Sequence, residues 1–215
     1  EILIGQTNRE ESDQALKGAK YDDVVVTMIG EKLVINSYND EKLEGAVEKV
    51  LAALKNENGK VLLSNKSTFA ERATYPLSDI TLNGTSLKDY RIVTKAKPHA
   101  FVKNGVERLQ KAIIAASGFY LPIITDSTEA TGKEIVVGES KRPASTGTDV
   151  SEIGAYTYII KDSDGNVVVC ASDNDYTLSQ ALDALTKMVG SGKIEETKMT
   201  LDNCITPMLT SFCFT

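Results

Sequence analysis

The chain reads Glu1-Ile2-Leu3-Ile4-Gly5-Gln6-Thr7-Asn8-Arg9 at one place and Glu134-Ile135-Val136-Val137-Gly138-Glu139-Ser140-Lys141-Arg142 at another. Glu, Ile, Gly and Arg recur at a constant spacing of 133 residues, and both positions between Ile and Gly are apolar in each copy. A short apolar run that ends at a glycine predicts a buried β-strand followed by a turn. Because the stretch occurs twice, we expect two structurally related units in tandem.

The residues that follow each copy also correspond. Two apolar runs, 24–29 and 32–35, flank Gly30-Glu31, which predicts a hairpin with a two-residue turn. In the second copy the runs 156–160 and 167–170 flank the polar segment 161–166, so we expect a loop that is two residues longer. A change of two residues preserves the side-chain alternation of the flanking strands, and the repeat therefore tolerates it.

An amphipathic helix follows each predicted hairpin. Asp40 and Asp175 stand at the two helix starts, 135 residues apart, where a carboxylate caps the first turn or interacts favourably with the helix dipole. Spacings of three and four residues place one apolar stripe on each helix, which indicates packing on a sheet. The stripes are Leu43, Ala46, Val47, Val50 and Leu54 in the first copy, and Leu178, Ala181, Leu182, Leu185 and Val189 in the second.

The second copy has further elements ahead of its shared stretch. Residues 90–93 predict a strand, the segment from Pro98 to Gly118 an amphipathic helix, and residues 121–124 another strand. The second unit is thus expected to be β-α-β-β-β-β-α, and the first to lack the opening β-α-β. Two short strands are also expected, at 61–63 and 80–82, whereas the polar run 8–20 predicts a loop.

The expected fold class is therefore α/β, an α+β sandwich of two tandem units, each a mixed β-sheet with helices packed on it. Residues 1–86 form the first unit in this interpretation, residues 87–192 the second, and residues 193–215 a C-terminal tail that covers a sheet edge or leads into a further domain. A strand that begins at Glu1 without a methionine predicts that residues upstream have been removed.

Composition excludes several classes of protein. The 215 residues are 41% hydrophobic and 25% charged with a net charge of −6, typical of a globular domain, and no basic stripe predicts nucleic-acid binding. No apolar run approaches the roughly 18–20 residues of a membrane span. Three cysteines cannot form a disulfide framework; Cys170 is expected to be buried, whereas Cys204 and Cys213 could pair.

Several motifs suggest chemistry but are better explained structurally. Asp40-Glu41 resembles the carboxylate pair of substrate-assisted glycosidases, yet a helix start explains it. The run Asp162–Asn166 lacks the spacing of a calcium loop and favours a hairpin turn. Gly132-Lys133-Glu134 lacks the residues of a phosphate loop. His99, the single histidine, has no cysteine near it. We therefore predict no catalytic residue, cofactor or metal.

Arg9 and Arg142 are the candidate ligand-binding residues, since each follows the shared strand at the same position. They could contact an anion or a sugar, but a salt bridge or carbonyl contacts that fix the following loop are the favoured interpretation. Tyrosine rings could offer sugar-stacking surface, although the sequence shows no aromatic cluster. The tyrosines considered are Tyr75, Tyr90, Tyr120, Tyr156, Tyr158 and Tyr176.

The second unit resembles the small non-catalytic α/β domain that precedes the catalytic barrel in β-N-acetylhexosaminidases and α-glucuronidases. The similar segments are residues 82–93, 109–123, 134–138 and 176–181, and the second half recurs at residues 1–54. Related domains occur in large bacterial surface or secreted proteins. The resemblance implies an accessory module with an extracellular or cell-surface location, and it carries over no catalytic residue. The doubled unit and the absence of a following barrel are departures from that pattern.

Three functional hypotheses follow. The first is a non-catalytic accessory module of a carbohydrate-active or cell-surface bacterial protein, which acts as a scaffold or contacts a glycan, a partner or other domains of the same polypeptide. The second is a glycoside hydrolase-like enzyme with a site shared between the units. The third is an assembly protein in which the truncated first sheet pairs with another chain. The sequence favours the first, because no catalytic residues converge.

Overall fold

The computed structural model describes residues 1–58, 60–62, 68–146, 154–172 and 175–201. They fall into two compact units: unit 1 contains residues 1–76 and 117–120, and unit 2 contains residues 77–116 and those from 121 onward. Mixed β-sheets carry helices in both units, so the predicted α/β class is confirmed. The helices are α1 (Glu10–Leu16), α2 (Asp40–Ala53), α3 (Ala100–Ser117), α4 (Pro143–Thr146) and α5 (Asp175–Ser191).

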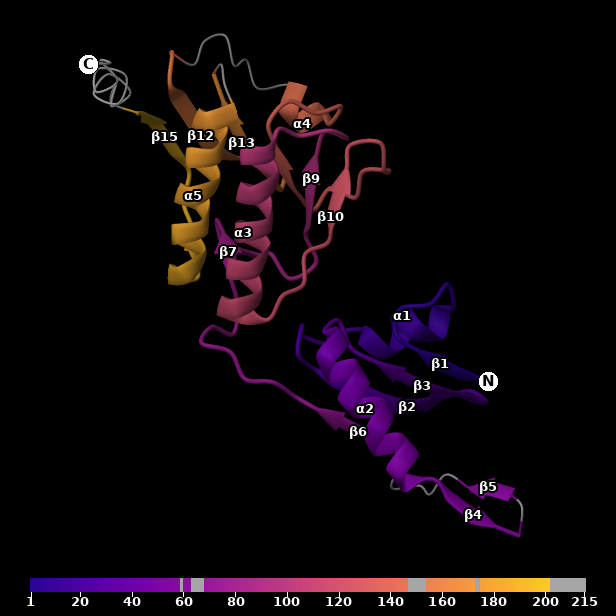
Figure 1. The fold of residues 1–215 in the computed structure, drawn as a ribbon. Coiled ribbons are helices and arrows are strands. Elements are labelled where there is room, and N and C mark those ends of the chain that lie inside the picture. The colour runs from indigo at the N-terminus through magenta and orange to yellow at the C-terminus, as the bar shows by residue number, and fades with distance from the viewer. Residues whose placement is uncertain (59, 63–67, 147–153, 173–174, 202–215) are drawn as a thin grey trace, which may run out of the picture. The chain divides into compact units, whose positions relative to one another are not determined.

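Unit 1 is built on a four-stranded sheet of order β1-β3-β2-β6 (Figure 1). Strand β1 is parallel to β3, whereas β2 is antiparallel to both β3 and β6. Helix α2 covers one face, where Ala46 and Val50 pack against alternate residues of β2 and β3. The strands of this unit are β1 (Ile2–Ile4), β2 (Val24–Ile29), β3 (Lys32–Asn36), β4 (Lys55–Glu57), β5 (Lys60–Leu62) and β6 (Phe69–Glu71).

Unit 2 is built on a six-stranded sheet of order β10-β9-β11-β13-β12-β15, in which the first four strands are parallel. Helices α3 and α5 lie side by side (Figure 1), and Gly105 of α3 faces Leu182 of α5 so closely that an added Cβ would lie 2.8 Å from it. The strands are β7 (Thr81–Leu82), β8 (Thr85–Ser86), β9 (Arg91–Thr94), β10 (Ile123–Thr125), β11 (Glu134–Val137), β12 (Thr157–Ser163), β13 (Asn166–Ala171), β14 (Lys193–Ile194) and β15 (Thr197–Thr200).

The order β9-α3-β10-β11-β12-β13-α5 confirms the predicted β-α-β-β-β-β-α succession of the second unit, with α4 added after β11. Strand β11 is parallel to β13, β13 is antiparallel to β12, and β12 is antiparallel to β15. In unit 1 the strands β1, β3, β2 and β6 have the same succession of pairings. The two shared stretches thus occupy corresponding positions, one in each sheet.

The glycine that ends each shared stretch has the same local role. Gly5 and Gly138 have φ angles of 72° and 67°, a region that residues with a Cβ rarely adopt. A Cβ on Gly5 would lie 3.2 Å from Leu43 Cδ2, and one on Gly138 would lie 2.8 Å from Leu178 Cδ2. Both conformation and packing therefore require glycine between the strand and the following helix.

The prediction of a longer second hairpin loop is wrong. Strand β12 continues through Ser163 and pairs with Asn166, so Asp164-Gly165 is a two-residue turn, the same length as Gly30-Glu31. The polar residues after Ile160 suggested a loop, but they extend the ladder. Val26 and Ile160 hold matching registers 134 residues apart, so one extra residue precedes β12 and another precedes α5, where the spacing becomes 135.

The prediction of a loop over residues 8–20 is also wrong, since α1 spans Glu10–Leu16. Its charged composition hid a short amphipathic pattern in which Ser12 and Leu16, four residues apart, are both buried. At α2 the N-cap is Asn39, whose side chain accepts hydrogen bonds from the amides of Glu41 and Lys42, while Asp40 is the first helical residue.

The unit boundaries differ from those expected at residues 86 and 192. The segment 77–86 belongs to unit 2 because β7 pairs with β14 of the supposed tail. Ile80 and Leu82 are fully buried there. Strand β15 covers the β12 edge, as the sequence allowed. The predicted strand 61–63 corresponds to β5, with Leu63 outside the described residues, as are Cys204 and Cys213.

Substitution of Gly138 by alanine should destabilise unit 2 by about 2–5 kcal/mol, because a strained φ angle and overpacking against Leu178 add together. Gly132→Ala is the matched control, since Gly132 has a φ of 74° but no atom within 4 Å of its added Cβ. Urea unfolding of both variants separates the two costs. Equal destabilisation would show that the contact with Leu178 is not constraining.

Candidate ligand-binding site

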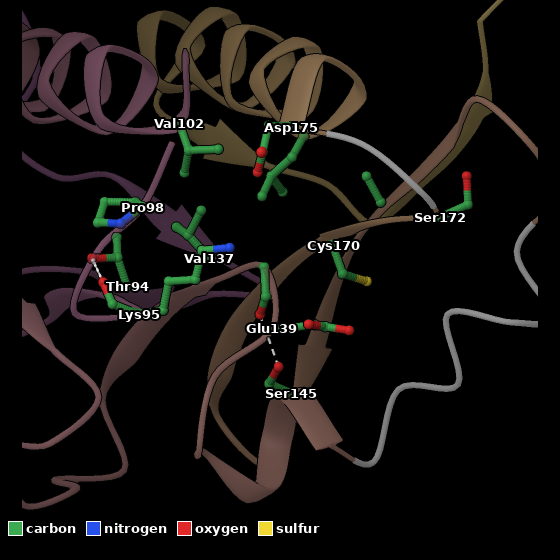
Figure 2. Close-up of a pocket in the computed structure, with 13 residues that line it drawn as sticks. Thr94, Lys95, Pro98, Val102, Val137, Glu139, Ser145, Cys170, Ser172 and Asp175 are labelled. Atoms are coloured by element: carbon green, nitrogen blue, oxygen red, sulfur yellow. Dashed lines mark hydrogen bonds between the residues drawn. The ribbon is translucent and has the colours of Figure 1, made fainter. Parts of the chain in front are cut away.

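A cavity of about 230 Å³ lies in unit 2 at the carboxyl ends of three parallel strands (Figure 2). Figure 2 shows Val102 and Asp175 approaching it from the starts of α3 and α5, while Val137, Glu139 and Cys170 come from the strand ends. The full lining is Thr94, Lys95, Pro98, Val102, Val137, Gly138, Glu139, Ser145, Cys170, Ala171, Ser172, Asp175 and Leu178.

The topology of the sheet explains why a cavity forms here. The chain leaves β9 toward α3, which packs beside α5. It leaves the neighbouring β11 toward α4, whose Ala144 packs against Val168 and Cys170. These residues alternate with Val167 and Val169 and so lie on the opposite sheet face from them. Connections that diverge from adjacent parallel strands leave a crevice outside their carboxyl ends, where ligands of α/β proteins commonly bind.

The cavity wall combines both charges with hydroxyl groups. Lys95 and Glu139 are exposed at its rim, and Asp175 is half-buried at the start of α5. The hydroxyl-bearing residues Thr94, Ser145 and Ser172 also line the wall, while Val102, Val137 and Leu178 provide apolar contact. Such a wall can donate and accept hydrogen bonds beside an apolar surface, which suits a small polyhydroxylated ligand.

Sequence reasoning missed every charged residue of this cavity. Lys95, Glu139 and Asp175 directly follow β9, follow β11 and begin α5. The signal that could have identified them is positional: residues just beyond neighbouring parallel strands meet at one edge of the sheet. We had interpreted Asp175 only as a helix-start residue.

The cavity offers no activated nucleophile. Cys170 is the one thiol in its lining, and burial raises the pKa of this thiol, which keeps it protonated. His99 does not line the cavity; it is exposed, and its Nδ1 accepts a hydrogen bond of 3.3 Å from the amide of Phe101. Over the described ranges, no three His, Cys, Asp or Glu side chains are grouped as a metal site would require.

The other weighed motifs lie where they stabilise local structure. Asp40 and Glu41 are exposed in the first turn of α2, as expected of anions near a helix N-terminus. Asp162 Oδ1 accepts the amide hydrogen of Gly165 at 2.9 Å, and both Asp164 and Gly165 have positive φ angles, as in a tight hairpin turn.

Arg142 lies in a buried charge cluster rather than at the cavity. Its Nε donates to Glu134 Oε2 at 2.6 Å and its Nη2 to Oε1 at 3.1 Å. Arg91 donates to Glu134 Oε1 from Nε and Nη2, at 3.0 and 2.8 Å. The Glu134 side chain is 2% exposed and that of Arg142 7%, so this carboxylate holds two guanidinium groups away from water.

Arg9 forms the corresponding but weaker pair. Its Nε lies 3.5 Å from Glu1 Oε1, so the eight-residue spacing of Glu and Arg produces an ion pair in both units. The side chains of Arg9 and Glu1 are 54% and 43% exposed, and Lys32 also approaches Glu1 at 3.7 Å. Neither arginine lines the cavity; each is placed to fix the loop that follows its strand.

The tyrosines form a cluster in unit 1 that the sequence did not reveal. Tyr120 stacks between Tyr21 and Tyr38, with ring centroids 5.7 and 4.9 Å away. Tyr75 donates to Asp22 Oδ2 at 2.8 Å, and burial together with this bond raises its pKa to about 12. In unit 2, Tyr90 and Tyr158 are buried, Tyr156 is half-buried, and Tyr176 is exposed.

Comparison with known proteins adds no family. No protein-family model matches the chain, and no curated protein matches it. Among the described helices, none has the length and apolar character needed to cross a membrane.

Replacement of Glu134 by glutamine should destabilise unit 2 by about 3–5 kcal/mol, because two buried guanidinium groups would lose their counter-charge. Glu1→Gln is the matched control and should cost about 0–1 kcal/mol, since its ion pairs are long and exposed. Denaturant unfolding measures both. A similar small cost for the two variants would contradict the buried-charge account.

Cys170 should react slowly with a disulfide reagent, because it is buried and its raised pKa lowers the thiolate fraction at neutral pH. In a Cys204→Ser/Cys213→Ser background we expect labelling at pH 7.5 at least about ten-fold slower than that of glutathione, with a rate that still rises above pH 9. Labelling at the rate of glutathione would contradict this description of the thiol.

Proposed function

We propose that this chain is a non-catalytic accessory module of a carbohydrate-active or cell-surface protein, and that the unit 2 cavity contacts a saccharide. The cavity carries the proposal, since it combines hydrogen-bonding groups of both kinds without an activated nucleophile. An extracellular location belongs to the same proposal, through the resemblance of unit 2 to accessory domains of glycosidases.

The size and chemistry of the cavity support a small sugar. A volume of about 230 Å³ lies below the roughly 300–1,000 Å³ of pockets that enclose drug-sized ligands, so one sugar residue or a chain end fits better than an oligosaccharide. Neighbouring sugar hydroxyls donate and accept together, and Lys95, Glu139 and Asp175 supply the complementary groups. The apolar side chains Val102 and Leu178 suit a sugar's C–H faces.

A hydrolase remains the second candidate because the cavity contains two carboxylates, Glu139 and Asp175. Glycoside hydrolysis uses such a pair when one carboxyl is protonated and the other ionised. Burial produces this difference in known cases. Here Glu139 is exposed and Asp175 half-buried, and neither environment is strongly apolar. The observations therefore favour binding over turnover.

Calorimetric titration with methyl N-acetylglucosaminide and methyl glucuronide tests the binding site. We expect Lys95→Met to weaken binding of the preferred sugar by about ten-fold or more, as expected when a charged hydrogen bond is lost. Lys97→Met is the matched control, because Lys97 is exposed on the same loop but does not line the cavity. Absence of binding to both sugars, or equal effects of the two variants, would reject the saccharide site.

Aryl glycosides of the same sugars test for turnover. The proposal expects no release of the aryl group above the uncatalysed rate. Turnover that disappears in both Glu139→Gln and Asp175→Asn, but persists in the exposed control Glu129→Gln, would establish the hydrolase instead.

A further inference from the structure

The shared strand is buried in unit 2 but largely uncovered in unit 1. Ile135 and Val137 of β11 are 0% and 2% exposed, whereas Ile2 and Ile4 of β1 are 61% and 50% exposed. These residues occupy matching positions, because Ile2 pairs with Leu33 as Ile135 pairs with Val167. Two isoleucines in one short strand thus expose apolar surface that the corresponding strand buries.

Two neighbours account for the burial of β11. Strand β9 pairs with it on the side away from β13, with Ile92 opposite Ile135. On the sheet face, helix α3 brings Val102 to the cavity that Val137 also lines. In unit 1, β1 is an edge strand, and β3 is its one pairing partner within the described residues.

The helix beside this strand shows the same difference. Leu182 of α5 is fully buried and meets Gly105 of α3. Its counterpart on α2, by the 135-residue spacing, is Val47, which is only half-buried. Ile2 and Ile4 are in register with Leu33 and Ile35, the β3 residues that α2 covers. The uncovered isoleucines and the flank of α2 therefore form one continuous surface.

We infer that this surface, formed by Ile2, Ile4 and Val47, docks a strand–helix segment that precedes β1 in the polypeptide. The strand is short and apolar and pairs parallel to β1, and the helix places a small residue against Val47, as α3 places Gly105 against Leu182. The source follows from chain order in unit 2, where β9, α3 and β10 come directly before β11. An open edge carrying exposed isoleucines is otherwise a template for aggregation.

Hydrogen exchange at residues 2–4 tests the inference. The polypeptide is isolated untrimmed from its natural source and compared with the 215-residue chain. We expect the β1 amides that point away from β3 to exchange at least about ten-fold more slowly in the untrimmed polypeptide. Ile2→Thr/Ile4→Thr should remove that protection. The control Met28→Thr should retain it, because Met28 is 51% exposed on β2, away from the open edge.

Three results would overturn the inference. The first is equal exchange of β1 in the two polypeptides, which includes the case of an untrimmed polypeptide that begins at Glu1. The second is protection that rises with protein concentration, which would identify a second copy as the occupant. The third is equal thiol labelling of an Ile4→Cys variant in the two polypeptides, in the background without Cys204 and Cys213. This measurement does not depend on the stability of the threonine variants.

Discussion

Parallel pairing of a short apolar strand with the second strand of a hairpin is the constraint on which both units depend. In unit 1 it joins residues 2–4 to 33–35, and in unit 2 it joins residues 135–137 to 167–169. Each strand ends at a glycine with positive φ, which lets a leucine of the following helix approach the backbone. The helix can then cover the hairpin, so strand, turn and helix form one packing unit.

In unit 2 this arrangement separates stability from binding. Glu134 begins β11 and neutralises Arg91 and Arg142, while its amide donates to Asn166 at the start of β13. These contacts fix the amino ends of three adjacent strands. The carboxyl ends of the same strands diverge toward different sheet faces and leave the cavity. The edge that carries the buried charges is therefore not the edge available to a ligand.

Much of the fold could be predicted from sequence, because strand and helix periodicity report directly on burial. The order of elements in unit 2 followed from apolar runs and from the stripes of α3 and α5. The errors have physical causes. Polar residues such as Lys161 and Asp162 extend a ladder because backbone hydrogen bonds do not require apolar side chains. Charged α1 hides two buried positions, and β7 is attached by β14, more than 100 residues away in the sequence.

The candidate site was much less predictable than the fold. The repeated arginines were the conspicuous signal, but repetition reported a shared ion pair with glutamate rather than a ligand contact. Lys95, Glu139 and Asp175 carry no sequence motif and meet only because three strands end at one edge. Tyr21, Tyr38 and Tyr120 likewise gather from separated segments. Such sites depend on topology, which local patterns do not encode.

Protection of Cys170 tests the proposed saccharide site most directly, because its thiol lines the cavity. In the Cys204→Ser/Cys213→Ser background, the labelling rate is measured against increasing concentrations of the sugar that binds in calorimetry. The account predicts that labelling slows with a midpoint equal to the calorimetric dissociation constant. A rate that does not change at saturating sugar would contradict it and would place the ligand elsewhere.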